Sequence, residues 1–206
     1  MSSHSNTDPG SKPADPYTRV NKDDKVPTQQ KIEALDKFVS TCKFGMMTTR
    51  DRPSGRLVSR CMAIAAKESG SMDYLFFTNT ESHKTDELKN DPHVNIAFLD
   101  SSGQWASISG TASIETDRDL ITKYYSPTLK AWMGDLRDGK HDGSKNDPRI
   151  GIIRVKMVTA TYVLTDRTVL GRMVEIAKGM VTGTPANVNK IREITDAEVK
   201  SRRASQ

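Results

Sequence analysis

Short apolar runs with the period of a β-strand follow one another along the middle of the chain. Most links between them are short and carry turn residues, as in RDRPSG and KESGSMD. The runs cover 45–49, 57–65, 74–78, 94–99, 105–114 and 150–164. Six runs at this spacing predict a mostly antiparallel barrel or sandwich rather than a parallel doubly wound sheet.

Helical spacing interrupts the strand pattern at a few places. An amphipathic helix starts at Thr28, with Gly45 placed to end it, and a second fills 82–90 before an Asp-Pro pair. Two more start at Thr116, where the spacing is that of a capping box, and at Ser126, which is followed by proline. The chain is therefore expected to form a small β-barrel decorated with helices, a fold that is mostly β with some α.

The two ends of the chain lack this apolar pattern. The first 27 residues contain four prolines and hardly any large apolar side chain, so they cannot bury enough surface to offset the entropy of ordering. After Leu164 the apolar signal weakens. We expect a disordered N-terminal tail at 1–27, a folded domain at 28–185 and a flexible C-terminal tail at 186–206.

Two polar segments allow more than one interpretation. The glycine-bearing loop at 137–149 is either a solvated connection or a lid over a site. Near the end of the chain, Arg202, Arg203 and Ser205 have the spacing of a basophilic kinase site, a short pattern that is common by chance.

The chain shows no targeting signal in its first residues. They lack the apolar core of a signal peptide and the arginine content of a transit peptide, and no later segment approaches about 18 consecutive apolar residues. We expect a cytoplasmic protein that does not span a membrane.

The cysteine content and the net charge indicate which kinds of site and binding partner to expect. Cys42 and Cys61 lack metal-ligand spacing, and we expect both to be buried small apolar residues rather than a disulfide or a metal site. The net charge of +5 suits an anionic partner, but it is a weak electrostatic footprint for nucleic acid and fits a phosphorylated small molecule equally well.

The stretch FFTNTESHK passes abruptly from apolar to polar residues. A strand that ends near Thr78 and a helix that begins near Ser82 would bring the free backbone N–H groups of the helix start beside the hydroxyls of these two residues. His83 and Lys84 would lie at the same place. Such a turn can bind a phosphate, because hydroxyls donate hydrogen bonds and Lys84 adds a full charge. In the alternative interpretation Ser82 only caps a surface helix and Lys84 is solvated.

A second basic residue lies inside a neighbouring strand. The period of two places Arg60 and Met62 on one face of 57–65, and Cys61 and Ala63 on the other. A guanidinium on an otherwise apolar face needs a partner. That partner is either an internal carboxylate or a ligand phosphate shared with Ser82 and Lys84, which the bidentate geometry of arginine would suit.

The order of these motifs, together with DELKNDPHVNIAF, WASISGTASI and YYSPTLKAWM, carries a resemblance from about Lys31 to Leu164. The chain resembles the pyridoxamine phosphate oxidase-like superfamily of flavin-binding split β-barrels, and within it the general stress protein branch with its fungal blue-light-inducible members. The resemblance implies a six-stranded antiparallel Greek-key barrel. It also implies a homodimer with a flavin mononucleotide (FMN) between its subunits; FAD or a deazaflavin stays open.

The resemblance also implies roles for individual residues. Arg60, Ser82 and Lys84 would bind the flavin phosphate, with His83 at a position where relatives often have a more basic residue. The other expected contacts are Phe77 and Thr78 with the phosphate–ribityl region, Cys61, Met62 and Ala63 beside the isoalloxazine through their backbone, and Trp105 from the partner subunit. The alternative for Trp105 is an aromatic of the barrel core, whereas Trp132 is expected to serve packing.

Departures from the family pattern limit the expected chemistry. True pyridoxamine phosphate oxidases have a lysine where this chain has Ala65, and an Arg-x-His element near the C-terminus, but no histidine follows His141 here. Vitamin B6 oxidation is therefore not expected, and no catalytic residue stands out, so any chemistry belongs to the flavin.

Three functions remain as hypotheses. The first is an FMN-dependent oxidoreductase or flavin reductase of a small molecule, and the second is a flavin-binding stress or redox-response protein without turnover. The third, a nucleic-acid-binding barrel, is disfavoured because aromatic residues make up only 6% of the chain and lie in apolar strands.

Overall fold

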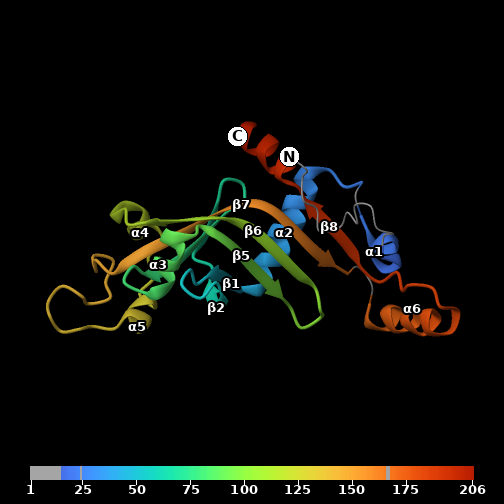
Figure 1. Ribbon diagram of the computed structural model, residues 1–206, viewed down its shortest axis with the longest axis horizontal. Coiled ribbons are helices and arrows are strands. Elements are labelled where there is room, and N and C mark those ends of the chain that lie inside the picture. Colours follow the sequence, from blue (N-terminus) through green and yellow to red (C-terminus); the bar gives the residue numbers. More distant parts are fainter. Residues whose placement is uncertain (1–14, 24, 166–167) are drawn as a thin grey trace. The chain divides into compact units, whose positions relative to one another are not determined.

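The computed structural model describes residues 15–23, 25–165 and 168–206, and Figure 1 labels most of its elements. The helices of these residues are α1 Pro16–Asn21, α2 Thr28–Cys42, α3 His83–Asn90, α4 Arg118–Tyr124, α5 Leu129–Met133, α6 Val169–Thr182 and α7 Asp196–Ala204. The strands are β1 Phe44–Arg50, β2 Leu57–Ala63, β3 Ala66–Glu68, β4 Asp73–Asn79, β5 His93–Leu99, β6 Trp105–Glu115, β7 Ile150–Leu164 and β8 Lys190–Ile194.

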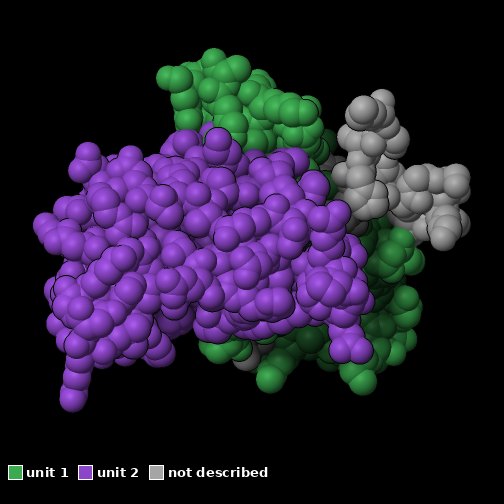
Figure 2. Space-filling view, turned by 60° about the vertical axis from the view of Figure 1, so that its left-hand side comes forward, with its two compact units in different colours: residues 1–42, 98–108, 159–206 green, residues 43–97, 109–158 purple. Residues whose placement is uncertain are grey.

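The chain divides into two compact units, which Figure 2 shows in green and purple. Unit 1 contains residues 1–42, 98–108 and 159–206, and unit 2 contains residues 43–97 and 109–158. In unit 2 the strand order is β2-β1-β5-β6-β7-β4-β3, and in unit 1 β8 pairs with the end of β7. The six predicted runs correspond to β1, β2, β4, β5, β6 and β7, so the expected mostly antiparallel sheet with peripheral helices is confirmed.

The core of unit 2 is built on β4 and β7. The register places Phe76 opposite Ile153 and Thr78 opposite Gly151, and the β4 side chains from Asp73 to Phe76 are buried. A side chain on Gly151 would bring its Cβ to 2.5 Å from the Thr80 methyl carbon. Glycine at this position therefore lets the chain turn tightly after β4, directly before the start of α3.

In unit 1 the C-terminal segment is ordered, in contrast to the flexible tail expected at 186–206. Strand β8 pairs with β7, and a full capping box between Thr195 and Glu198 starts α7. The other Glu198 oxygen accepts hydrogen bonds from Thr28 and from the buried Lys31 of α2, at 3.0 and 2.8 Å. These contacts join segments about 170 residues apart, which a local sequence pattern cannot reveal.

The expected disordered tail at 1–27 is also partly replaced by structure. Asp15 caps α1, and the buried Asn21 accepts hydrogen bonds from the backbone N–H groups of Val188 and Asn189. The remainder of that prediction, at 1–14 and 24, lies outside the described residues. Asn21 thus satisfies buried backbone donors, and a bridge between Lys22 and Ile191 and an ion pair between Asp23 and Arg192 add to the contacts of this segment.

The loop at 137–149 is fixed at its C-terminal end. The buried Asp147 accepts from the backbone of Gly143 at 2.7 Å and pairs with the buried Arg149 at 2.6 Å. Arg149 also donates to the carbonyl of Gly134. The Arg149 side chain holds the pKa of Asp147 at about 2, against an ordinary 3.8. This end of the loop is therefore neither freely solvated nor arranged as a hinge.

Among the described residues no helix is both long enough and apolar enough to cross a membrane.

The expectation that Trp132 serves packing is wrong, because its side chain on α5 is 86% exposed.

Candidate functional site

The end of β4 and the start of α3 bring the predicted phosphate-binding residues together in unit 2. Thr78 is buried, and its hydroxyl accepts a hydrogen bond from the Lys84 ammonium at 2.7 Å. The Ser82 hydroxyl lies 3.5 Å from the same nitrogen. Lys84 is half-buried, and its partners are hydroxyl groups. The alternative interpretation, in which Lys84 is solvated, does not fit these contacts.

The start of α3 has no side-chain cap. Ser82 occupies the N-cap position, but its hydroxyl makes no capping hydrogen bond. The N-terminus of a helix carries unsatisfied N–H groups and a partial positive charge, which attract anions. Two hydroxyls, an ammonium and an uncapped helix start form a donor set that fits a phosphate group.

Arg60 has an internal carboxylate as its partner. Its two terminal nitrogens donate to the two Glu87 oxygens at 2.9 and 2.8 Å, and one of them also donates to Thr49 at 2.8 Å. Glu87 lies on α3 and its side chain is only 2% exposed. Of the two partners considered for Arg60, the carboxylate is the one that the structure contains.

Charge and burial act in opposite directions in this cluster. Burial raises the pKa of Glu87, but hydrogen bonds from Arg60 and Thr49 outweigh that effect, and the net pKa is lowered. Burial, and secondarily the charge of Arg60, lower the pKa of the Lys84 ammonium, while Glu87 raises it. A bound anion would offset both effects, because its negative charge favours the protonated ammonium of Lys84.

His83 lies beside the cluster, between two carboxylates. Its Nε2 is 3.7 Å from Asp51 and 3.6 Å from Glu87. One ligand atom from each of these three residues falls within 4.8 Å of the others, a spacing compatible with a metal ion. Both Glu87 oxygens already accept hydrogen bonds from Arg60, and a cation would be repelled by that guanidinium. We therefore assign no metal to this cluster.

The strand β2 shows the alternation that the sequence predicts. Arg60 and Met62 are half-buried, whereas Cys61 and Ala63 are exposed on the outer face. The expectation that both cysteines are buried is wrong, because Cys61 points outward and Cys42 is only half-buried. β2 comes first in the strand order, so the edge of the strand that faces away from β1 carries backbone groups outside the ladder.

Two aromatic residues complete the predicted set. The half-buried Phe77 packs against the unit 2 core cluster that includes Ile121 and Ile150. Trp105 belongs to unit 1, where it lines a hollow together with Tyr17 and Val163, and its side chain is 38% exposed. Trp105 is therefore not a fully buried core aromatic.

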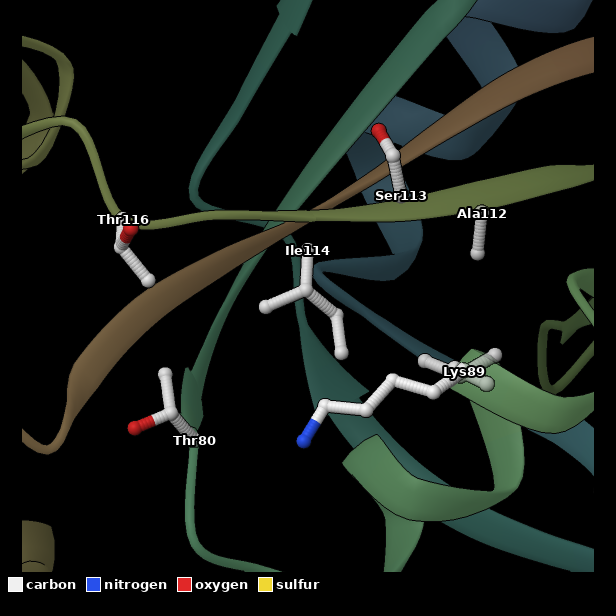
Figure 3. Close-up of a pocket in the computed structure, with 7 residues that line it drawn as sticks. Thr80, Lys89, Ala112, Ser113, Ile114 and Thr116 are labelled. Atoms are coloured by element: carbon white, nitrogen blue, oxygen red, sulfur yellow. The ribbon is translucent and has the colours of Figure 1, made fainter.

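Sequence reasoning missed a hollow beside the last turn of α3. It is lined by Thr80, Leu88, Lys89, Ala112, Ser113, Ile114 and Thr116. Figure 3 shows the Lys89 side chain extending between Thr80 and Ile114. Lys89 also pairs with Asp86 of its own helix at 3.3 Å. The exposed, paired Lys89 is a weaker anion ligand than Lys84, and it offers a matched control on the same helix.

Comparison with known proteins gives matches over most of the chain. The family model of pyridoxamine 5'-phosphate oxidase like proteins matches residues 30–187. Protein bli-3 of Neurospora crassa is 59% identical over 202 residues, which are 98% of this chain and 97% of that protein.

Solved structures share the fold. A protein related to general stress protein 26 of Bacillus subtilis, from Clostridium acetobutylicum, matches 83% of this chain and 98% of its own, with a TM-score of 0.57 and 15% identity. A pyridoxamine 5'-phosphate oxidase-related, FMN binding protein from Nostoc punctiforme matches 67% of this chain and 84% of its own, with a TM-score of 0.53 and 17% identity. These matches confirm the split-barrel fold.

Proposed function

Because this chain belongs to the pyridoxamine 5'-phosphate oxidase-like family, we propose that it binds FMN and holds the flavin phosphate at the start of α3. The observation that carries this proposal is the half-buried Lys84, which donates to the hydroxyls of Thr78 and Ser82 beside an uncapped helix N-terminus. The FMN-binding description of the Nostoc punctiforme protein, which has the same fold, supports the choice of flavin.

Each residue of the cluster has a distinct part in this proposal. Lys84 supplies the charge. The Thr78 hydroxyl would give up its hydrogen bond to the Asn79 carbonyl, and it and the Ser82 hydroxyl would donate to phosphate oxygens. Arg60 holds Glu87 in place and reaches the phosphate with its remaining N–H groups. His83 adds a donor at the rim of the cluster, where its side chain is 71% exposed.

The flavin ring is proposed to lie along β2. Along Cys61, Met62 and Ala63 the backbone groups alternate between β1 and the free edge, and those at the free edge can form hydrogen bonds with the polar edge of the isoalloxazine. Phe77 contributes through the ribityl region, and Trp105 contributes from the second subunit of a homodimer. The bound flavin would supply reversible electron transfer, and the protein would supply orientation and access.

Replacing Lys84 with methionine should weaken FMN binding by roughly 10- to 100-fold, since a hydrogen bond to a charged group is worth about 1.5–3 kcal/mol. The affinity can be measured by quenching of flavin fluorescence during titration. Riboflavin, which lacks the phosphate, should bind the wild type and the variant equally. Lys89→Met, on the same helix, should leave FMN affinity unchanged.

Two outcomes would contradict this assignment. Equal loss of FMN and riboflavin binding in Lys84→Met would mean that the lysine supports the fold rather than the phosphate. A loss confined to Lys89→Met would place the phosphate in the hollow that Lys89 lines.

A second candidate function is flavin storage or sensing without turnover. No carboxylate, histidine or cysteine in the Lys84 cluster forms a nucleophile–base pair, which leaves any reaction to the flavin itself. Anaerobic addition of a reduced nicotinamide to the FMN-loaded protein separates the two functions. Bleaching of the flavin absorbance within seconds supports a reductase, whereas a stable yellow colour supports storage or sensing.

A further inference from the structure

Three hydroxyl residues of the chain have an arginine at the third position before them. This is the spacing that arginine-directed protein kinases recognise in their substrates. The three pairs are Arg56 with Ser59, Arg192 with Thr195, and Arg202 with Ser205. The sequence pattern does not choose among them, but the structure does, because the three hydroxyls lie in different surroundings.

Two of these hydroxyls belong to structures that hold the fold together. Ser59 lies inside β2 and shares a hydrogen bond with the hydroxyl of Thr48 on β1 at 2.8 Å. Thr195 is the N-cap of α7, and its hydroxyl accepts from the backbone of Glu198 at 3.3 Å and donates to the Glu198 carboxylate at 3.1 Å. Modification of either residue would break a strand pairing or a capping box.

Ser205 lies directly after the last residue of α7, and it is exposed. The backbone N–H groups of Ser205 and Gln206 donate to the carbonyls of Arg202 and Arg203 at 3.3 and 3.4 Å. These distances exceed the usual limit of about 3.2 Å, and the ends of helices fray. The Ser205 hydroxyl donates within the same turn, to the Arg202 carbonyl at 2.8 Å. This turn can therefore open without disturbing the capping box at the other end of α7.

The residues before Ser205 are the only two adjacent arginines of the chain. Two guanidinium groups in succession can each pair with a carboxylate in the substrate cleft of a kinase. The Arg202 guanidinium also donates to the Ser205 Oγ at 3.3 Å. A phosphate on that oxygen would therefore have a cation within reach after the modification.

We propose that Ser205 is a phosphorylation site for an arginine-directed serine/threonine kinase. In the reaction the Ser205 Oγ forms a bond to the γ-phosphorus of ATP, and the bond from that phosphorus to the oxygen bridging to the β-phosphorus breaks. ADP leaves, and the hydroxyl proton passes to the catalytic base of the kinase. Arg202 and Arg203 serve recognition before the transfer, and Arg202 pairs with the phosphate after it.

The modified residue would lie beside a contact that orders the C-terminal segment. In unit 1, Ser205 lines a hollow together with Thr28, Glu198 and Arg202. The Glu198 carboxylate in this hollow accepts from Lys31 of α2 at 2.8 Å. A phosphoserine adds about −1.5 to −2 charges. Phosphorylation would thus change the charge next to the contact between α7 and α2.

The full-length protein tests the site with ATP, Mg²⁺ and the catalytic subunit of cyclic-AMP-dependent protein kinase, which is an arginine-directed enzyme. The intact mass should show a single added phosphate group per chain, and fragment masses should place it on Ser205. Ser205→Ala should abolish the modification. Ser201→Ala is the matched control, because Ser201 lies on the same helix but has Glu198 at the third position before it, and the rate should stay unchanged.

A second pair of variants tests the role of the arginines. Arg202→Ala combined with Arg203→Ala should lower the kcat/KM of the kinase for this protein by roughly 10- to 100-fold, because the lost contacts are charge-assisted. Loss of α7 in this variant would expose Ser205 and raise the rate, so a lower rate reports recognition. Arg56→Ala, which removes the arginine before Ser59, should leave the modification unchanged.

Other results would overturn the proposal. Phosphate on Ser59 or Thr195 in place of Ser205 would show that the strand and the capping box do not protect these hydroxyls. An unmodified wild type would show that α7 keeps Ser205 out of the kinase cleft. Equal modification of Ser205 by casein kinase 2, an acid-directed enzyme, would show that the arginines are not what is recognised. None of these measurements uses flavin, so they stand or fall independently of FMN binding.

Discussion

Replacing Arg60 with alanine should lower the free energy of unfolding by about 3 kcal/mol, because it leaves a buried carboxylate without its cation. Glu87 is almost completely buried and accepts from both terminal nitrogens of Arg60, so that the Thr49 hydroxyl would remain as a hydrogen-bond donor and His83 would lie 3.6 Å away. Urea denaturation followed by circular dichroism measures this loss.

Neutralising the carboxylate provides the control. Combining Arg60→Ala with Glu87→Gln should recover much of the lost stability, because an amide costs less to bury than an unpaired charge. FMN affinity in this double variant then reports on the phosphate contact alone. An Arg60→Ala protein of unchanged stability would show that the guanidinium serves the ligand and not Glu87.

Replacing Asp147 with asparagine should lower the free energy of unfolding by a similar amount, about 3 kcal/mol, because it leaves a buried guanidinium without its carboxylate. The side chain of Arg149 is 6% exposed and would stay buried with only carbonyl partners, among them Gly134. The N–H groups of Gly143 and Arg149 donate to different oxygens of Asp147, and asparagine keeps only one oxygen, so the loss combines the charge with one of these hydrogen bonds. Limited proteolysis in the loop at 137–149 should accelerate together with the loss of stability.

Lowering the pH should remove the stability that the Asp147–Arg149 ion pair contributes in the wild type. The pKa of Asp147 is lowered to about 2 in the folded protein, against 3.8 ordinarily, so its contribution is complete above pH 3.8 and is lost as the pH falls towards 2. Asp147→Asn should therefore lose less stability over this interval than the wild type does. Equal slopes for the two proteins between pH 4 and pH 2 would contradict the assignment.

Local patterns accounted for the elements that position the site. The β4 run and the polar residues after it predicted a strand, a turn and a helix start, and the contact of Lys84 with Thr78 spans only six residues. The alternation along β2 gave the correct faces for Arg60 and Cys61, because a strand exposed on one side has a strict period of two.

Tertiary pairing was beyond the reach of those patterns. Arg60 and Glu87 are 27 residues apart, and nothing in the sequence near either residue distinguishes this carboxylate from others. The strand β8 was missed because its buried residues, Ile191 and Ile194, are three positions apart and do not follow the strand period. The helix α6 was missed because glycines at 171 and 179 lower helix propensity.

The contacts of the Glu198 carboxylate limit how far the chain can be shortened at its C-terminus. The family match ends at residue 187, which makes that position a natural place to shorten the chain. A protein shortened there would lose β8 and α7, and with them the acceptor for Lys31, whose ammonium would be left buried without a carboxylate. In unit 1 the last helix thus holds the first residues of α2 in place, and the minimal folding unit extends beyond the end of the family match.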